Sequence, residues 1–595
     1  MAEPERVRES QASDCAPAPR IVEREVPEHT QLSAIDSELL RRIYAGRGIG
    51  DAAELDYRLA GLPDFSGFKH IEAAVDELEG AITAGRVIHV VGDFDADGAT
   101  STTLALDVLA ACDACVDFFM PHRATHGYGL SPAVVEAIGS PPAAGGLILT
   151  VDNGIAAVAG VEAAQAAGWR VVVTDHHLPG ERLPPAEAIV NPNQPGCGFA
   201  SKNLAGVGVV FYVMAALRAR LAERGVPRLP RMVELLDLVA VGTVADVVAL
   251  DHVNRTLVSQ GLRRIQAGRG RPGINALAEI AGREPRRLDT DDIGFAIGPR
   301  INAAGRLEDM RLGVACLRAR GIEQARRAAE TLSSINRQRR SVQQRMQAQA
   351  EAALDRITAF DELPSAVVVY ENDWHEGIVG LIASRLRERV HRPVIAFAPG
   401  EHGDLKGSAR SIPGLHIRDA LAAVEAAAPG LIRRFGGHAQ AAGLSLAPDN
   451  LSEFSRRVEQ AVAARLTTAM TTREFLTDGE LGGAEHCLEV ATRLRNGGPW
   501  GAGFEAPLFH GAYHVVDQRI VGRGHLKLTV QACVGGPPIE AMLFNRDKLL
   551  DASRVYRLVF RLQVNEFRGT QRANLIIEHC RVDQPDEPAQ QRALD

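Results

Sequence analysis

The chain contains 595 residues, of which 46% are hydrophobic and 24% are charged, and its formal net charge is -8. This composition is ordinary for a folded protein and excludes wholesale disorder, and the length leaves room for about three to five domains. Because the net charge is negative, any binding to nucleic acid must depend on local positive patches. Only five of the 66 basic residues are lysines, and none of them precedes Ser or Thr, which excludes the P-loop of ATP-driven helicases.

The sequence predicts neither a membrane span nor a secretion signal. Acidic residues interrupt the longest apolar run, residues 232–250, so we expect a buried helix and strand there. Residues 1–10 carry acids and lack an apolar core. Cys112 and Cys115 form a lone CxxC, and we expect small buried core residues rather than a zinc or redox site. These features indicate a reduced, cytoplasmic protein that does not bind membranes.

The first half of the chain predicts an α/β domain. Residues 1–48 are polar and contain Pro, and we expect a loose arm that ends in a short helical segment. From residue 86 onward, short β-branched runs alternate with Ala-rich helical segments, which is typical of buried parallel strands. Three of these runs lie at 87–91, 146–151 and 170–174, and they end at Asp93, Asp152 and Asp175. Ligands bind outside the carboxyl ends of such strands, so we expect the three acids to converge on one crevice.

The middle of the chain predicts a long helical stretch at residues 311–356. Within residues 310–350 there are nine Arg and only two acidic residues. Two interpretations stay open: a solvated helix face, or a basic connecting helix that follows a phosphate backbone.

The second half predicts another α/β unit and then a β-rich region. Strands are expected at 366–370 and 393–397, with a helix at 377–390 between them. After residue 467, strands at 525–530, 539–544 and 555–564 predict a small β-barrel. Residues 519–572 contain ten Arg or Lys and only four acidic residues, and Phe544 and Phe567 lie among them. This pattern suits an OB-fold that binds single strands; a purely structural β-domain is the alternative.

The segment GDFDADGAT at residues 92–100 carries the strongest chemical signal. If it is extended, Asp93, Asp95 and Asp97 face one small volume. Carboxylates that lie so near one another repel each other unless a cation neutralises their charge. An EF-hand is excluded, because its twelfth position would be Leu104 and a strand precedes the loop.

Further acids and a histidine pair extend this signal. Asp152 begins a tight turn, and Asp175 is followed by His176 and His177. Asp246 lies in an apolar run, where a carboxylate is costly without a charged partner or a metal. Several carboxylates beside a His pair favour a dinuclear Mn²⁺ or Mg²⁺ site over zinc. Two such ions can generate a hydroxide and stabilise both oxygens of an in-line phosphoryl displacement.

In order, these motifs resemble those of the DHH phosphoesterase superfamily: DFDADG, PHR at 121–123, VDNG at 151–154, TDHH at 174–177 and ADVV at 245–248. Four further motifs resemble the RecJ single-strand DNA exonuclease family: GPRINAAGRL at 298–307, WHEGIVGLIASRL at 374–386, KGSARSI at 406–412 and RFGGHAQAAG at 434–443. The resemblance covers roughly residues 85–445, and the β-rich C-terminal region fits the OB domain of that family. The chain departs from the family pattern at Phe94, where Tyr is usual, at Ala249, where Pro is usual, and at residues 210–212, where the family often has Ala-Phe-Lys.

The resemblance implies an α/β fold with a DHH-type parallel-sheet domain, a connecting helix, a second α/β DHH-associated domain and a C-terminal OB-like β-barrel, with the metal crevice between the two α/β domains. The expected boundaries are an arm at 1–48, the DHH domain at 49–308, the basic helix at 309–358, the DHH-associated domain at 359–466, the OB-fold at 467–585 and a tail at 586–595.

The resemblance also assigns roles to residues. The implied metal ligands are Asp95, Asp97, Asp152, His176 and Asp246, with Asp152 as the bridge. Asp93 and Asp175 would orient ligands, and His177 would face the scissile phosphate. The implied phosphate contacts are Arg123, Arg306, Gly407, Ser408, Arg410, Gly437 and His438. Trp374 and His375 either stack on a base or pack the second domain.

The implied activity is metal-dependent 5′→3′ hydrolysis of single-stranded DNA to 5′-mononucleotides, in DNA repair and recombination, with two Mn²⁺ or Mg²⁺ ions as cofactors. The implied partners are single-stranded DNA with a 5′ end, a single-strand-binding protein and a helicase, and we expect a monomer. Small DHH proteins that act on pyrophosphate, short oligonucleotides or cyclic dinucleotides are one alternative, against which the length and the basic β-region argue. A binding protein on a decayed scaffold is another, but it should have lost metal carboxylates, and every expected Asp and His is present.

Overall fold

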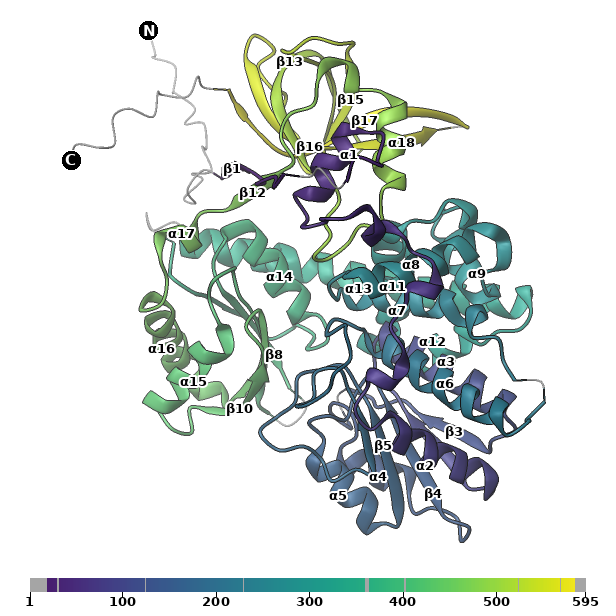
Figure 1. Cartoon of the computed structure of the whole chain (residues 1–595). Coiled ribbons are helices and arrows are strands. Elements are labelled where there is room, and N and C mark those ends of the chain that lie inside the picture. Colours follow the sequence, from purple (N-terminus) through teal and green to yellow (C-terminus); the bar gives the residue numbers. More distant parts are fainter. Residues whose placement is uncertain are drawn as a thin grey trace. The chain divides into compact units, whose positions relative to one another are not determined.

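The computed structural model describes residues 19–28, 32–123, 125–227, 229–358, 363–400, 403–522, 524–567 and 569–583. The chain divides into two compact units (Figure 1). One comprises residues 23–336 and 476–595, and the other comprises residues 1–22 and 337–475. The tail expected at 586–595 lies outside the described residues, as do residues 1–18 of the expected arm.

A five-stranded parallel sheet forms the centre of the first unit. Its strands are β2 (Val87–Val91), β3 (Val116–Phe119), β4 (Gly146–Val151), β5 (Trp169–Thr174) and β6 (Ala188–Val190), in the order β3-β2-β4-β5-β6. The three expected strands are thereby confirmed. Every residue of β4 is buried, because helices cover both faces of the sheet, and this explains the apolar runs.

The helices around this sheet fall into two groups. Ile148 packs in a core with residues of α4 (Pro132–Ile138) and α5 (Val158–Ala166). Leu147 and Leu149 point to the opposite face and join the core of α2 (Ile71–Thr83), α3 (Ala96–Ala111) and α6 (Gly206–Glu223). The alternation along one strand therefore builds two cores from one sequence run.

A helical layer continues this unit: α7 (Leu236–Asp246), α8 (His252–Arg264), α9 (Pro272–Ile280), α10 (Thr290–Asp292), α11 (Gly298–Leu307) and α12 (Arg311–Leu317). The expectation of a strand within residues 232–250 is wrong: residues 232–235 form a short 3₁₀ turn, and α7 follows. Helix α7 packs against both α3 and α8. It is therefore apolar on nearly all sides, and its apolar residues do not recur with the period of an amphipathic helix.

Two further expectations need correction. The helical stretch expected at 311–356 is broken, because α12 ends at Leu317 and α13 spans Ile322–Thr358. At the break, Arg318 donates a hydrogen bond to Asp107 (Nε to Oδ1, 3.1 Å), which fixes the chain against α3. Cys112 is buried as expected, but Cys115 is exposed.

The second unit contains a mixed sheet of β7 (Val367–Tyr370), β8 (Val394–Pro399), β9 (Leu405–Arg410), β10 (Ile432–Gly437) and β11 (Ala441–Leu446), in the order β10-β11-β9-β8-β7. Strands β7 and β8 are parallel, and the other pairs are antiparallel. Its helices are α14 (Val379–Val390), α15 (Ile417–Ala427), α16 (Leu451–Ala463) and α17 (Thr468–Thr471). The second α/β unit is confirmed, with a core of its own around Phe397 and Phe454.

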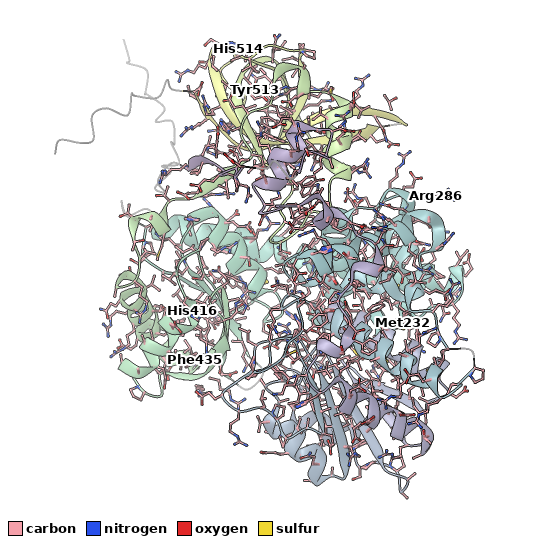
Figure 2. The ribbon with its side chains drawn as sticks, viewed as in Figure 1. Met232, Arg286, His416, Phe435, Tyr513 and His514 are labelled. Atoms are coloured by element: carbon pink, nitrogen blue, oxygen red, sulfur yellow. The ribbon has the colours of Figure 1, made fainter. Side chains whose placement is uncertain are left out.

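A closed barrel follows in the first unit, after α18 (Leu488–Asn496). Its strands are β13 (Phe509–Val521), β14 (His525–Ala532), β15 (Ile539–Leu543), β16 (Val555–Phe567) and β17 (Thr570–Val582). They close in the order β13-β14-β15-β17-β16, which confirms the expected barrel. Tyr513 and His514 on β13 show the alternation (Figure 2): Tyr513 is buried and bonded to His486 (2.6 Å), whereas His514 is exposed.

The N-terminal helix α1 (Glu38–Ala45) is joined to the segment that leads into the barrel. The Tyr44 ring stacks on Trp500 at 6.0 Å and on Phe504 at 6.3 Å. Arg47, just after the helix, donates to the Asp478 carboxylate (Nη1 to Oδ1, 2.7 Å), and both side chains are buried. Strand β1 (Arg20–Glu23) pairs with β12 (Glu474–Thr477). The described residues 20–23 and 38–47 are therefore joined to residues 474–504.

Among the described residues, none of the helices has both the length and the apolarity that crossing a bilayer requires.

The buried pair between Arg47 and Asp478 predicts a stability effect. Asp478→Ala should lower the free energy of unfolding by about 3–5 kcal/mol, because it leaves a buried guanidinium without its partner. Denaturant unfolding of the full chain, followed by Trp fluorescence, measures the change. Glu489→Ala is the control, since Glu489 forms an exposed pair with Arg493 and its loss should change little. Equal stability of the two variants would contradict the prediction.

Candidate metal centre and active site

The carboxyl ends of the central strands carry the candidate site. Asp93 lies two residues after β2, Asp152 directly follows β4, and Asp175 directly follows β5. The expected convergence is found: Asp93, Asp95 and Asp152 form one group whose ligand atoms lie within 4.8 Å of one another. Asp97, His176 and Asp246 form a second such group, and Asp152, His176 and His177 form a third. Asp152 and His176 each belong to two groups, so the clusters are adjacent.

The first of these motifs is not extended as expected. Asp95 is the N-cap of α3 and accepts a hydrogen bond from Gly98 N (3.0 Å), and Asp97 lies in the first turn of that helix. Gly98 allows this geometry, since a Cβ there would collide with the backbone of Asp93. The helix begins directly after Asp95 because the N-cap bond satisfies a helix donor that an extended segment would leave unpaired.

The helical placement directs Asp97 toward α6. Its carboxylate accepts hydrogen bonds from Gly206 N (2.6 Å) and Val207 N (2.9 Å) at the start of that helix. The positive end of the helix dipole and two N–H donors therefore face a buried carboxylate. Gly242 on α7 makes room, because a Cβ there would lie 2.9 Å from Asp97 Oδ1.

Asp152 is held in a strained backbone conformation. Its φ is +63°, in the left-handed region that non-glycine residues seldom adopt. The neighbouring Asn153 supports it: the buried amide donates to the carbonyls of Val91 (3.0 Å) and Val151 (2.9 Å) and accepts from Leu130 N (3.1 Å). Asn153 thus fastens the turn to two strands, a supporting role that the motif VDNG alone did not reveal.

The donor atoms in the site fit divalent metal ions. His176 Nε2 lies 3.1 Å from Asp152 Oδ1 and 3.5 Å from Asp246 Oδ2. Both His176 Nε2 and Asp152 Oδ1 are buried without a hydrogen-bond partner. The ring of His176 also bonds the backbone of Leu204, and because Nε2 has no partner, we assign that bond to Nδ1. Two lone pairs then face each other, an arrangement that a cation stabilises.

The pKa values show how strongly the site favours added positive charge. Burial, followed by the neighbouring carboxylates, raises the pKa values of Asp93, Asp97 and Asp152 well above their usual range. Burial and Asp95 raise the pKa of Asp246 to about 7. Burial lowers the pKa of His176 to about 4, so its imidazole is neutral at physiological pH and able to act as a ligand.

His177 has the opposite electrostatics. Burial by itself would lower its pKa, but the hydrogen bond to Asp175 (Nδ1 to Oδ1, 2.7 Å) and nearby carboxylates outweigh burial and raise it to about 9. Asp175 in turn is oriented by Ile155 N (2.9 Å). The other ring nitrogen of His177, Nε2, lies 3.1 Å from the hydroxyl of Tyr128. Sequence reasoning missed Tyr128, whose only signal was its place shortly after the PHR motif.

Arg123 and Arg306 lie beside this centre. The Arg123 guanidinium lies over the Phe94 ring, 4.3 Å from its centroid, so Phe94, the departure from the family pattern, supplies an aromatic face for a cation–π contact. Arg306 is in the last turn of α11. That helix is attached to the DFDADG segment, because Ala96 N donates to Asn302 Oδ1 (2.7 Å) and Gly305 packs against the Phe94 carbonyl.

The remaining predicted phosphate contacts gather within the second unit. Gly407, Ser408 and Arg410 lie on β9, and Gly437 ends β10, with β11 between the two strands. Arg410 is paired with Ala441, and His438 N donates to Ala441 O (2.9 Å), so both residues lie at the same end of this sheet. Arg410 Nη1 also donates to Ser408 Oγ (2.8 Å).

Trp374 is buried and donates to Gln349 Oε1 (2.9 Å). Of the two expectations for this residue, packing is the one that the structure favours; its neighbour His375 is exposed.

Comparison with known proteins places this architecture in a class. Residues 87–243 match the DHH family, N-terminal domain; residues 363–464 match the DHHA1 domain, and residues 477–579 match the RecJ OB domain. The chain therefore combines a DHH-type catalytic domain with its associated domain and an OB-fold, which confirms the expected fold class.

Relatives then identify the family. The chain is 47% identical over 566 residues to the single-stranded-DNA-specific exonuclease RecJ of Escherichia coli, covering 93% of this chain and 98% of that protein. It is 50% identical over 552 residues to RecJ of Dickeya dadantii, covering 91% and 95%. The crystal structure of Thermus thermophilus RecJ in complex with Mn²⁺ matches with a TM-score of 0.78 at 30% identity, covering 96% of this chain and 80% of that one. The Mg²⁺ complex matches with a TM-score of 0.73 at 28% identity, covering 96% and 79%. The chain belongs to the RecJ family of single-stranded-DNA-specific exonucleases.

The pKa of Asp246 predicts that metal binding depends on pH. Lowering the pH from 7.5 to 5.5 should weaken Mn²⁺ binding by at least about tenfold, because a proton on Asp246, whose pKa is about 7, competes with the ion. His176 should not compete in this range, since its pKa is about 4. Isothermal titration calorimetry at both pH values measures the change. Asp246→Asn is the matched variant and should bind Mn²⁺ more weakly at pH 7.5, with a smaller pH dependence. Equal affinity of the unmodified chain at both pH values would contradict the assignment.

Proposed function

We propose that the chain is a metal-dependent 5′→3′ exonuclease that hydrolyses single-stranded DNA to 5′-mononucleotides and acts in DNA repair and recombination. The observation that carries the proposal is the set of three adjacent ligand groups that share Asp152 and His176, in a chain of the RecJ family. A single-strand-binding protein and a helicase are the proposed protein partners, and the proposed active form is a monomer. The proposed domain boundaries are those expected from the sequence.

The proposed metal ligands are the five residues that the family resemblance implies. Asp95 and Asp152 would hold one ion, Asp97, His176 and Asp246 would hold the other, and Asp152 would be shared between the two. Two Mn²⁺ or Mg²⁺ ions bound there supply Lewis acidity and make water a stronger nucleophile. Asp93 and Asp175 orient their neighbours through hydrogen bonds to backbone N–H groups and to His177.

Hydrolysis requires charge stabilisation around the scissile phosphate. The oxygen of water bonds to phosphorus, the bond from phosphorus to the 3′-oxygen of the terminal nucleotide breaks, and that oxygen leaves with a proton. His177 carries a proton at neutral pH, so its Nε2–H can face the phosphate oxygens. Tyr128 holds the same nitrogen at 3.1 Å and thereby helps to orient the ring.

The proposed contacts to DNA are distributed over three parts of the chain. Arg123 and Arg306 bind phosphate beside the metal ligands, because a guanidinium presents a planar fork to phosphate oxygens. Gly407, Ser408, Arg410, Gly437 and His438 bind phosphate from the second unit. In the barrel, the half-exposed Phe544 and the exposed Arg519 supply a stacking face and a positive charge for the trailing strand.

Substitutions in the metal site should have graded effects. Asp152→Asn should lower the turnover of single-stranded DNA by more than about a hundredfold, because the bridging carboxylate is lost. Asp175→Asn should lower it by about 10–100-fold, the usual cost of losing a group that orients a ligand. Single-stranded DNA labelled separately at each end, incubated with Mn²⁺ or with chelator, measures the rate and which end is released first.

Asp36→Asn is the matched control, since Asp36 is an exposed aspartate of the same unit and should leave the rate unchanged. Early release of the 3′ label would overturn the proposed polarity. Near-normal turnover by Asp152→Asn would overturn the metal assignment.

A further inference from the structure

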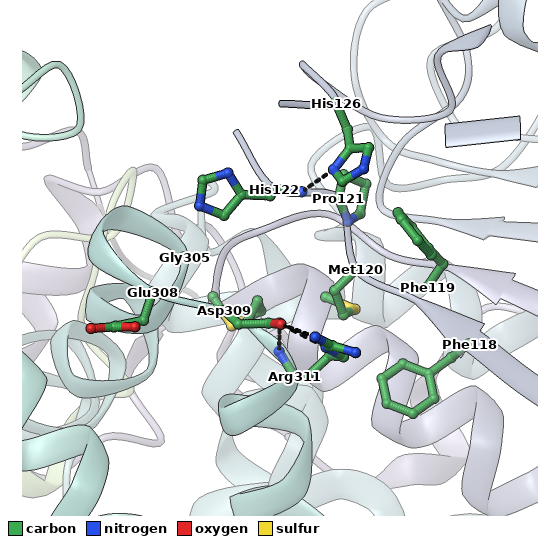
Figure 3. A pocket seen from close by; sticks show the side chains of 11 residues that line it. Phe118, Phe119, Met120, Pro121, His122, His126, Gly305, Glu308, Asp309 and Arg311 are labelled. Atoms are coloured by element: carbon green, nitrogen blue, oxygen red, sulfur yellow. Dashed lines mark hydrogen bonds and ion pairs between the residues drawn. The ribbon is translucent and has the colours of Figure 1, made fainter. Parts of the chain in front are cut away.

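A cavity of about 290 Å³ opens beside the metal site, at the carboxyl end of β3 (Figure 3). One wall consists of Phe118, Phe119 and the buried Met120. The opposite wall comes from the end of α11 and the start of α12, and carries Glu308 and Asp309. Of the lining residues, Pro121, His122 and Gly305 belong to the motifs named above, and the others do not.

The cavity borders the backbone that precedes two of the proposed phosphate contacts. Its lining residues His122 and Gly305 directly precede Arg123 and Arg306 in the chain. Gly305 also packs against the carbonyl of Phe94, between Asp93 and Asp95. A nucleotide whose phosphate is bound by the two arginines would therefore lie close to this opening.

The chemistry of the walls suits a nucleobase. The Phe119 ring is held edge-to-face against His126 (5.2 Å between centroids, 87° between planes), so it is a fixed aromatic surface. Stacking on aromatic side chains together with hydrogen bonds to base edges is the general way in which proteins hold an unstacked base. Glu308 is an exposed residue at the edge of the cavity lining.

Other ligands fit less well. The single arginine of the cavity, Arg311, is engaged by Asp309 (Nε to Oδ2, 2.6 Å), and the two acids would repel a phosphate. Among the residues that the structure describes, the histidines and acids of this cavity form no group with metal-ligand spacing. The volume is at the low end of the roughly 300–1,000 Å³ of small-molecule sites, which suits one planar group and not an oligonucleotide.

We propose that this cavity binds the nucleobase of the 5′-terminal nucleotide of the bound strand. The proposal rests on the exonuclease function proposed above and adds a base-binding subsite to it. The terminal base is then withdrawn from the stack of its neighbours while its phosphate is bound by Arg123 and Arg306. The subsite should tolerate all four bases, because stacking uses the face that every base presents.

The test compares two 5′-phosphorylated single strands, one intact and one that lacks only the terminal base. The full chain should bind the intact strand about tenfold more tightly in chelator, the size expected for one stacked base, and degrade it with a correspondingly lower KM in Mn²⁺. Phe119→Leu removes the ring while retaining an apolar side chain, and should abolish this preference. Phe65→Leu is the matched control: Phe65 is also half-buried and lies in the same unit but outside the cavity, and the preference should persist.

Equal binding of the two strands by the unmodified chain would overturn the proposal, as would a preference that survives Phe119→Leu. If the two strands bind equally while a deoxynucleoside monophosphate, but not deoxyribose 5-phosphate, inhibits degradation, the cavity serves the released product, and the proposal is likewise overturned. Because binding is measured in chelator, a failure of the chain to degrade either strand would count against the proposed function alone.

Discussion

The mutual repulsion of buried carboxylates is the constraint on which the rest of the structure depends. Asp93, Asp97 and Asp152 are almost fully buried and lie within one small volume, where like charges and the loss of water both disfavour ionisation. The fold compensates locally. Helix α6 presents N–H groups to Asp97, and the N-terminus of α3 does the same for Asp95. Divalent ions can neutralise the negative charge that these donors leave.

Close packing keeps this arrangement in place. The backbone at Asp152 is strained, and the amide of Asn153 fastens it to β2 and β4. Gly206 lets α6 approach Asp152, where an added Cβ would lie 2.5 Å from the carboxylate. A larger side chain at this glycine would displace the ligand itself. Stability and metal geometry therefore depend on the same contacts, as is expected where strain is concentrated at a functional site.

The two histidines of the DHH motif show how environment separates two identical side chains. His176 is neutral because burial, followed by the charge of neighbouring His177, lowers its pKa to about 4. His177, one residue further on, is bonded to Asp175 and holds its proton. One is thereby suited to ligate a cation and the other to face an anion. Opposite pKa shifts in adjacent groups are a general mark of assigned chemical roles.

Much of this could be predicted from the sequence, because the evidence is local. The apolar runs of β2, β4 and β5 and the acids at their ends follow from periodicity and from the geometry of parallel sheets, and the alternation in β14 to β16 similarly predicted a barrel. The ordered motifs identified the candidate ligands and the family. These predictions are confirmed because the sequence pattern of a buried strand with a carboxylate at its end is local and does not depend on the rest of the fold.

Other features were decided only by tertiary structure. The helical start at Asp95 and Asp97 depends on Gly98 packing against Asp93, and the break between α12 and α13 coincides with a bond from Arg318 to Asp107, more than 200 residues away in sequence. Tyr128 reaches His177, and the ends of β3 and α11 line one cavity, only because separate strands and helices end at the same edge of the sheet. A single sequence records which residues are present and their local pattern. Their distances across the fold arise from packing between segments far apart in the chain, and it is those distances that bring the metal centre and its neighbouring cavity together.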